Sequence, residues 1–173
     1  EACTYPDACD GTGMCAGGPG ALEGAVSVTA GLHHTCALLD TGRVRCWGEG
    51  VGGLHAMEEP SPVDIEGLPS GMGGVSAGTF FTCAVSGTGA AYCWGFNLFG
   101  QLGDGTTTHR EFPGQVTGLS SGVVAVDAGY DHACALLNTG GLKCWGGNDA
   151  GQVGDGTTEQ RNAPVEVLNI SNA

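Results

Sequence analysis

The sequence predicts an all-β protein made of three successive copies of one antiparallel unit. Three observations favour this fold class. A segment containing cysteine and tryptophan occurs three times, short apolar runs alternate with glycine-rich turns, and no apolar pattern of helical period is long enough to predict a helix. The 34 glycines in 173 residues follow no collagen-like period, and 7 prolines are too few for a proline-rich linker. The composition therefore indicates a turn-dense globular fold.

The repeated segment begins at Val28, Val75 and Val126, where the chain reads VTAGLHHTCALLDTGRVRCWG, VSAGTFFTCAVSGTGAAYCWG and VDAGYDHACALLNTGGLKCWG. The second and third copies continue alike, through NLFGQLGDGTTTHREFPGQ and NDAGQVGDGTTEQRNAPVE, whereas the first diverges at residues 49–59. Units of about 50 residues with several short strands are typical of propeller blades. We therefore expect three blade-like repeats, at about residues 21–68, 69–119 and 120–173.

Each repeat contains a predicted hairpin with two cysteines ten residues apart. A three-residue loop that ends in a left-handed glycine places the two cysteines opposite each other across an antiparallel pair. Directly opposed residues bring their β-carbons near the separation that a disulfide needs. We therefore predict three disulfides within the repeats, with loops that end at Gly42, Gly89 and Gly140: Cys36–Cys46, Cys83–Cys93 and Cys134–Cys144.

Cysteine content and charge restrict the compartment and the partners. Nine cysteines with no C-x-x-C motif indicate disulfides in an oxidising compartment, so we expect an exported protein, extracellular or on the cell surface. A formal charge of −13 disfavours nucleic acids and anionic lipids as partners. No apolar run approaches the length of about 18 residues that a membrane-spanning helix needs, so no span is expected.

The N-terminal segment, residues 1–20, differs from the repeats. It contains Cys3, Cys9 and Cys15, and it is interpreted as a small disulfide-tied segment. Once the hairpin cysteines are paired, one of these three is left over, either bonded to a cysteine outside this sequence or present as a free thiol. Zinc is disfavoured because the C-x5-C-x5-C spacing is unusual for zinc ligands and no histidine lies nearby.

The run HTCALL-x2-G-x-V-x-CWG, followed by N-x2-GQLGDGTT, resembles the repeat of regulator-of-chromosome-condensation-type β-propellers, in the cysteine-paired form of exported bacterial proteins. The resemblance covers about residues 22–173. It implies four-stranded antiparallel blades around an axis, in rings of about seven. Three repeats are fewer, so the chain is expected either to be a piece of a longer polypeptide or to form an arc that identical subunits complete. The family has no single function.

Several polar and aromatic residues recur at equivalent repeat positions. Asp104 and Asp155 lie between glycines, where Asx-type turns are expected and calcium binding is the alternative. Arg110 and Arg161 are expected to pair with these carboxylates at blade junctions. Buried amides are expected to satisfy backbone groups between blades, and tryptophans to pack against neighbouring blades; these residues are Asn97, Gln101, Asn148 and Gln152, and Trp47, Trp94 and Trp145.

No nucleophile, acid–base pair or cofactor loop stands out, so we expect a non-enzymatic module without a cofactor that binds a protein partner or is displayed on a surface. Its interaction site is expected in the divergent stretch, at Leu54, His55, Met57, Glu58 and Glu59. One alternative is a subunit of an extracellular polymer, assembled from identical copies through blade edges. Another is a carbohydrate-binding module with exposed tryptophans. Glycans are possible at the acceptor sequence of residues 169–171.

Overall fold

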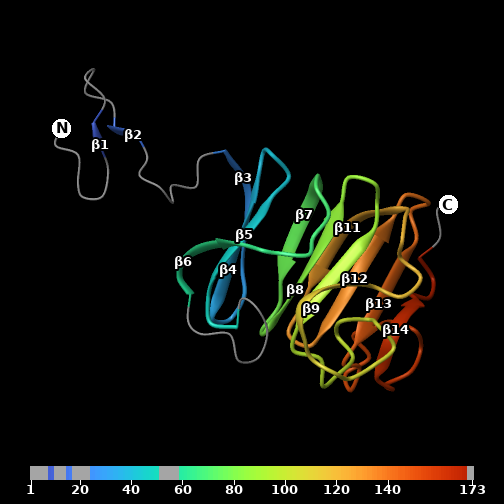
Figure 1. Ribbon diagram of the computed structural model, residues 1–173. Coiled ribbons are helices and arrows are strands. Elements are labelled where there is room, and N and C mark those ends of the chain that lie inside the picture. The colour runs from blue at the N-terminus through green and yellow to red at the C-terminus, as the bar shows by residue number, and fades with distance from the viewer. Residues whose placement is uncertain (1–7, 10–14, 17–23, 51–58, 171–173) are drawn as a thin grey trace.

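The computed structural model describes residues 8–9, 15–16, 24–50 and 59–170 (Figure 1). Every regular element in these ranges is a β-strand, which confirms the predicted all-β class. The strands from Ala25 onward form three antiparallel four-stranded sheets, and strands that are consecutive in the chain are neighbours in the sheet. No α-helix, and hence no helical membrane span, occurs in the described ranges.

We call the three sheets blades 1, 2 and 3 in chain order. Blade 1 consists of β3 (Ala25–Ala30), β4 (His34–Leu39), β5 (Val44–Gly48) and β6 (Glu59–Asp64). Blade 2 consists of β7 (Met72–Ala77), β8 (Phe81–Ser86), β9 (Ala91–Gly95) and β10 (Arg110–Gln115). Blade 3 consists of β11 (Val123–Ala128), β12 (His132–Leu137), β13 (Leu142–Gly146) and β14 (Arg161–Glu166).

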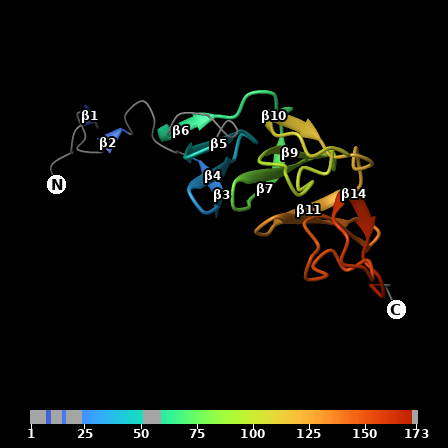
Figure 2. The same cartoon turned by 90° about the horizontal axis from the view of Figure 1, so that it is seen from below.

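The blades are arranged as an arc, with the face of one sheet against the face of the next (Figure 2). The first strands β3, β7 and β11 lie on the inner side of the arc, where β7 contacts both of the others. The last strands β6, β10 and β14 lie on the outer side. The predicted array of three propeller-type blades is therefore confirmed.

The second and third strands of each blade form the predicted cysteine hairpin. In blade 1, Cys36 lies opposite Cys46, and a backbone hydrogen bond from Leu39 to Arg43 closes a three-residue loop. The loop ends at Gly42, whose φ of 76° lies in the left-handed region that glycine adopts without a steric penalty. The other two hairpins have the same register, and their loops end at left-handed Gly89 and Gly140.

All three predicted cysteine pairs in the blades lie at bonding distance. The sulfur–sulfur distances are 2.11, 2.06 and 2.05 Å, in the chain order Cys36–Cys46, Cys83–Cys93 and Cys134–Cys144. Each bond closes a short loop and so removes conformational freedom from the unfolded chain, which contributes about 2–3 kcal/mol to the free energy of unfolding. The disulfides hold together strands whose many glycines favour the unfolded state.

Side chains alternate between the two faces of each blade. The face that carries the disulfide points toward the next blade, and we call it the forward face; the opposite, or back, face carries the tryptophan. At the first junction, Trp94 of blade 2 is 1% exposed and shares a buried cluster with Cys36–Cys46. At the second, Trp145 of blade 3 is 0% exposed and shares a cluster with Cys83–Cys93. These two tryptophans therefore pack between blades.

The N-terminal segment contains a pair of short strands. β1 (Ala8–Cys9) and β2 (Cys15–Ala16) are antiparallel, and Cys9 lies opposite Cys15 in the register of the backbone. The sulfur pairing predicted for Cys3, Cys9 and Cys15 lies outside what the structure describes. The assignment of the odd cysteine therefore stays a prediction.

Candidate functional site

Two connections of every blade lie at the same end of its sheet: the turn between its first two strands and the loop that follows its third strand. We call the surface that these connections form the loop end. In each blade a backbone hydrogen bond joins the two, with lengths of 2.9, 2.9 and 2.8 Å in chain order: Glu49 to His33, Phe96 to Phe80, and Gly147 to Asp131. The loop end is thus held by the same bond in all three blades.

A row of aromatic rings, which we call the aromatic row, crosses the loop end from blade 1 to blade 2. It consists of His33, Phe80, Phe96, Phe99 and His109. The His33 and Phe80 rings stack with centroids 5.8 Å apart, although they belong to different blades. Phe80 is 39% exposed and Phe99 is 41% exposed. Apolar ring surface of blade 2 therefore reaches the solvent beside the junction with blade 1.

Local backbone geometry fixes the position of these rings. Gly95 has a φ of 108°, and a β-carbon there would lie 2.6 Å from the Phe80 carbonyl oxygen. Glycine therefore allows the close approach by which the Phe96 amide donates to that oxygen. The backbone N–H of Asn97 donates a hydrogen bond to His109 Nδ1 at 2.9 Å. This bond holds the imidazole against the Phe96 ring, at a distance of 4.7 Å between ring centroids.

Carboxylates border the aromatic row at both ends. In blade 1, Glu49 Oε2 lies 3.9 Å from His33 Nδ1, and both side chains are exposed. Toward blade 3, Phe99 lines a cavity of about 280 Å³ together with Asp131 and Asp149. Apolar ring surface with carboxylates around it is complementary to a ligand that combines apolar and basic groups.

The repeated Asp-Gly-Thr loops hold their carboxylates through local bonds. Asp155 Oδ1 accepts hydrogen bonds from the Thr157 amide at 3.0 Å and from the Thr157 hydroxyl at 2.8 Å, and Oδ2 lies 2.5 Å from Arg161 Nε. The Thr157 hydroxyl and then the Arg161 guanidinium lower the pKa of Asp155 to about 2. The Asp104 loop repeats the arrangement, with Arg110 Nη1 at 3.5 Å. The predicted Asp–Arg pairs therefore form, but each joins a loop to the first residue of the next strand of the same blade and does not join two blades, as had been expected.

These contacts favour the Asx-turn interpretation of Asp104 and Asp155 over calcium binding. The carboxylate oxygens face hydrogen-bond donors, whereas calcium requires several converging oxygen ligands. Within the described ranges, no group of three or more acidic, histidine or cysteine side chains is placed to hold a metal ion. In both loops the carboxylate thus bonds the backbone and hydroxyl groups of its own loop.

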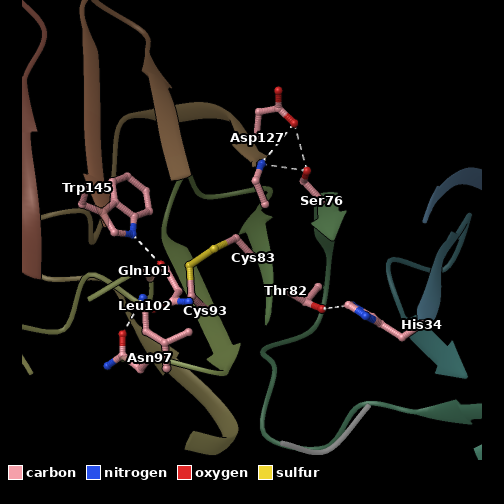
Figure 3. Close-up of a disulfide and its surroundings, with 11 residues drawn as sticks. His34, Ser76, Thr82, Cys83, Cys93, Asn97, Gln101, Leu102, Asp127 and Trp145 are labelled. Atoms are coloured by element: carbon pink, nitrogen blue, oxygen red, sulfur yellow. Dashed lines mark hydrogen bonds between the residues drawn. A yellow bond between two sulfur atoms is a disulfide. The ribbon is translucent and has the colours of Figure 1, made fainter. Parts of the chain in front are cut away.

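The buried amides Asn97 and Asn148 bond the backbone of their own loops, which corrects the expectation that they bridge two blades. Asn97 Oδ1 accepts from the Leu102 amide at 2.9 Å, and its Nδ2 donates to carbonyls of the same loop; Asn148 repeats this in blade 3. The hydrogen bond that crosses the junction between blades 2 and 3 is made by other groups. Trp145 Nε1 donates to the Gln101 carbonyl at 2.8 Å (Figure 3).

The interaction site predicted in the divergent stretch lies mostly outside the described residues; this applies to Leu54, His55, Met57 and Glu58. Glu59 begins β6, is half-buried and lies opposite Gly48 in the ladder. Together with His33 and Glu49 it lines a cavity of about 310 Å³. The described ends of the divergent stretch therefore adjoin the aromatic row.

The sequence contained an indication of the aromatic row that the comparison of the three repeats did not use. Phe80 is at the position that is Asp131 in the third repeat, and Phe96 and Phe99 are at the positions of Gly147 and Ala150. Blade 3 packs without rings at these positions, so the shared fold does not require them. Aromatic residues confined to one repeat therefore indicated a role outside the common core.

The fold and the loop end define a class of protein: an arc of propeller-type blades that presents aromatic loops at one end. The chain matches the Regulator of chromosome condensation (RCC1) repeat over residues 88–136, and a second form of the same repeat over residues 25–53, 74–101 and 123–152. It therefore belongs to the RCC1 repeat family. This confirms the family resemblance seen in the sequence.

Two curated relatives share about a third of their aligned residues with this chain. The probable E3 ubiquitin-protein ligase HERC4 of Rattus norvegicus is 32% identical over 155 residues, which are 84% of this chain and 14% of the ligase. The ultraviolet-B receptor UVR8 of Arabidopsis thaliana is 32% identical over 146 residues, which are 81% of this chain and 33% of the receptor. The chain therefore spans at most a third of the length of these two relatives.

Solved structures confirm the fold. Prp20p of Saccharomyces cerevisiae matches with a TM-score of 0.72 at 18% identity, over 86% of this chain and 39% of Prp20p. Human WBSCR16 matches with a TM-score of 0.71 at 23% identity, over 83% of this chain and 38% of the human protein. At these identities the likeness concerns the architecture of the blades alone.

Proposed function

We propose that this chain is an exported, non-enzymatic module that binds a protein partner through the aromatic row. The observation that carries the proposal is the exposure of Phe80 and Phe99 at the loop end, on two connections of blade 2, where Phe80 stacks on His33 of blade 1 and Phe99 lies toward blade 3. Leu98, 56% exposed, extends the apolar surface beside them. A contiguous exposed apolar patch with a polar rim is the usual mark of an interaction site, and aromatic residues are enriched in such sites.

The surroundings of the aromatic row indicate the chemistry of the partner. Glu49, Asp131 and Asp149 place carboxylates around the rings, and the chain has a net charge of −13. Opposite charges accelerate association and exclude partners of the wrong sign. The segment that fits is therefore apolar with basic residues beside it. Among the structural neighbours, Prp20 has been crystallised with Kap60 bound, which supports a protein as the class of partner.

Export is the second part of the proposal. Three disulfides within the blades require an oxidising compartment to form and persist, as in the cysteine-paired repeats of exported bacterial proteins that this chain resembles. The proposal of a carbohydrate-binding module has less support, because Trp94 and Trp145 are buried and have no face free for a sugar ring.

The experiment is a selection of random peptides displayed on phage against the immobilised 173-residue chain. The affinity of a selected peptide is then measured by fluorescence anisotropy for the wild type and for the F80S/F99S variant. We expect apolar–basic peptides, and an affinity at least about tenfold lower in the variant, because two half-exposed rings are lost from the centre of the contact.

The matched control is F112S. Phe112 lies on β10 and is 62% exposed, so its substitution removes an exposed ring outside the aromatic row. Wild-type affinity is expected in this control. If F80S/F99S binds the selected peptides as tightly as the wild type, or if F112S weakens them equally, the aromatic row is not the binding site.

A further inference from the structure

Blade 3 has a cavity at the place where blade 2 has a group of rings in contact. In blade 2 the Phe96 ring lies between the rings of Phe80 and His109, at centroid distances of 6.4 and 4.7 Å. The equivalent positions of blade 3 have no ring; they are Asp131, Gly147 and Gln160. All three line the cavity of about 280 Å³ beside Phe99. A difference in sequence between two otherwise similar blades therefore goes with an open space at the loop end.

Gly147 makes room for one of the carboxylates of this cavity. A β-carbon at residue 147 would lie 2.5 Å from Asp131 Oδ2. Because glycine has no side chain, the Asp131 carboxylate can lie against the backbone where blade 2 carries the Phe96 side chain. The Asp131 side chain is 18% exposed. Water therefore screens its charge less than it screens a carboxylate on the open surface.

One wall of the cavity, Phe99, belongs to blade 2. The loop that carries it is joined to blade 3 by a hydrogen bond of 2.9 Å from the Gly105 amide to the Asn162 carbonyl. A β-carbon at Gly100 would lie 2.4 Å from Asn162 Oδ1, so the loop and blade 3 are in close contact there as well. These contacts hold the Phe99 ring at the cavity. The face of an aromatic ring attracts a cation.

The side chains of the cavity offer acceptor oxygens. Gln152 Nε2 lies 3.5 Å from Asp131 Oδ1 and 3.3 Å from Asp149 Oδ1, which places the two carboxylates around one amide. Their Oδ2 atoms accept no hydrogen bond from the part of the chain that the structure describes. Gln160 Nε2 donates to Asn162 Oδ1, and its Oε1 is a further acceptor. A positively charged ligand with several N–H donors is therefore complementary to the cavity.

The cavity lies between two blades of the array and opens at the loop end. In blade 2 the positions of Asp131 and Asp149 are occupied by Phe80 and Leu98, which are 39% and 56% exposed although blade 3 follows. A blade that followed blade 3 in the same way would leave these positions accessible. The opening is therefore a property of the loop end that blades 2 and 3 share.

We propose that this cavity binds the guanidinium group of an arginine side chain, stacked on the Phe99 ring and hydrogen-bonded to the Oδ2 atoms of Asp131 and Asp149. A guanidinium is planar and carries its N–H donors in a fixed fork, so it can stack on a ring while it bonds carboxylates. A lysine ammonium has no flat face and is more strongly hydrated. This inference deepens the proposed function and rests on it, because the arginine belongs to the basic part of the partner segment.

The probe is N-acetylarginine amide, titrated into the isotope-labelled 173-residue chain and followed by two-dimensional NMR of the backbone amides. The signals of Gly147 and Asn148, which line the cavity, are expected to shift and to saturate with a dissociation constant on the order of 1 mM, usual for a ligand of this size. The matching lysine amide has the same charge, and the matching citrulline amide has the same shape without the charge. Each should bind at least about fivefold more weakly.

Variants of the cavity and a matched control locate the binding. D131N and D149N each replace a carboxylate by an amide of the same shape, and each should weaken binding of the arginine amide at least about fivefold. F99L removes the aromatic face and should weaken it about two- to fivefold. The control is E111Q: Glu111 is exposed on β10, outside the cavity, and its variant loses the same charge but should bind like the wild type. Circular dichroism verifies that all variants are folded, and D149N changes an exposed side chain.

Three results would overturn the proposal: a lysine or citrulline amide that binds as tightly as the arginine amide, shifts confined to signals away from the cavity, or wild-type affinity in D131N/D149N. The proposed function can fail separately. If the arginine amide binds as expected and no peptide is selected on the chain, the cavity is supported and the protein partner is wrong. If D131N/D149N binds the selected peptides as tightly as the wild type, the partner is supported and the arginine site is wrong.

Discussion

The two blade junctions have the same geometry and different chemistry. In the first, a buried polar pair, His34 and Thr82, lies beside Trp94. In the second, Phe81 and Ala133 fill the equivalent space beside Trp145 with apolar groups alone. The polar pair must keep its hydrogen bond, because a buried imidazole or hydroxyl without a partner costs free energy. The apolar pair depends only on shape and volume.

This difference shows that the repeat specifies a position for each contact, while the chemistry is specified by pairs of residues in successive blades. His34 and Phe81 are equivalent in the repeat, and so are Thr82 and Ala133. An exchange at one of these positions has to be matched by an exchange 48 or 52 residues away (82 − 34 and 133 − 81). Comparison of single repeats conceals such pairs.

The largest expected effect comes from removal of a junction tryptophan. W145A leaves a cavity in the apolar junction and the Gln101 carbonyl without its indole donor, so we expect a loss of about 3–5 kcal/mol in the free energy of unfolding. W94A is expected to cost a similar amount at the polar junction. The measurement is urea unfolding followed by circular dichroism. W47A is the control: Trp47 is half-buried on the open back face, and its loss should cost clearly less.

Removal of a disulfide separates loop entropy from packing. C83A/C93A and C134A/C144A both open loops with the same sequence separation of 10. The free energy of unfolding of each variant is therefore expected to fall by about 2–3 kcal/mol, because the unfolded chain gains conformational freedom. The first pair also lies at a junction, where its sulfurs share a buried cluster with Trp145, so C83A/C93A should cost more. If the two variants unfold at the same urea concentration, the sulfurs of Cys83 and Cys93 contribute no packing energy at the junction.

The polar junction is also expected to respond to pH. Burial lowers the pKa of His34, so the unfolded chain binds a proton more readily than the folded one. The free energy of unfolding should therefore fall as pH drops below about 6.5, toward the lower pKa of the folded state. H34F alone is expected to destabilise by about 1–2 kcal/mol at neutral pH, because Thr82 loses its partner.

The double variant H34F/T82A places the combination of the second junction at the first. It should recover most of the stability that H34F loses. The decrease of its free energy of unfolding below about pH 6.5 should be shallower than in the wild type, because the buried imidazole is gone. H33F serves as the control for the removal of a histidine as such, since His33 is exposed on the loop end and lies outside the polar junction. If the free energy of unfolding of the double variant falls with pH as steeply as that of the wild type, the pH dependence comes from another group.

The hairpins could be predicted from the sequence because their determinants are local. Two cysteines ten residues apart around a glycine-terminated loop determine which residues oppose each other, and the structure has that register in all three blades. The roles of Asn97 and Asn148 were predicted less well. Burial followed from their repeat position, but whether their amides bond their own loop or the neighbouring blade depends on how the loop folds back in space.

The sequence by itself determined the all-β class, the three cysteine pairs of the blades and the repeat family, because each depends on spacings along the chain or on short-range turn geometry. Only the tertiary structure decided that Trp94 and Trp145 pack on the preceding disulfide face, that rings from blades 1 and 2 form one aromatic row, and that His34 meets Thr82. These contacts join residues of different repeats. They exist only once one sheet face lies on another, since no local pattern encodes the packing of sheets.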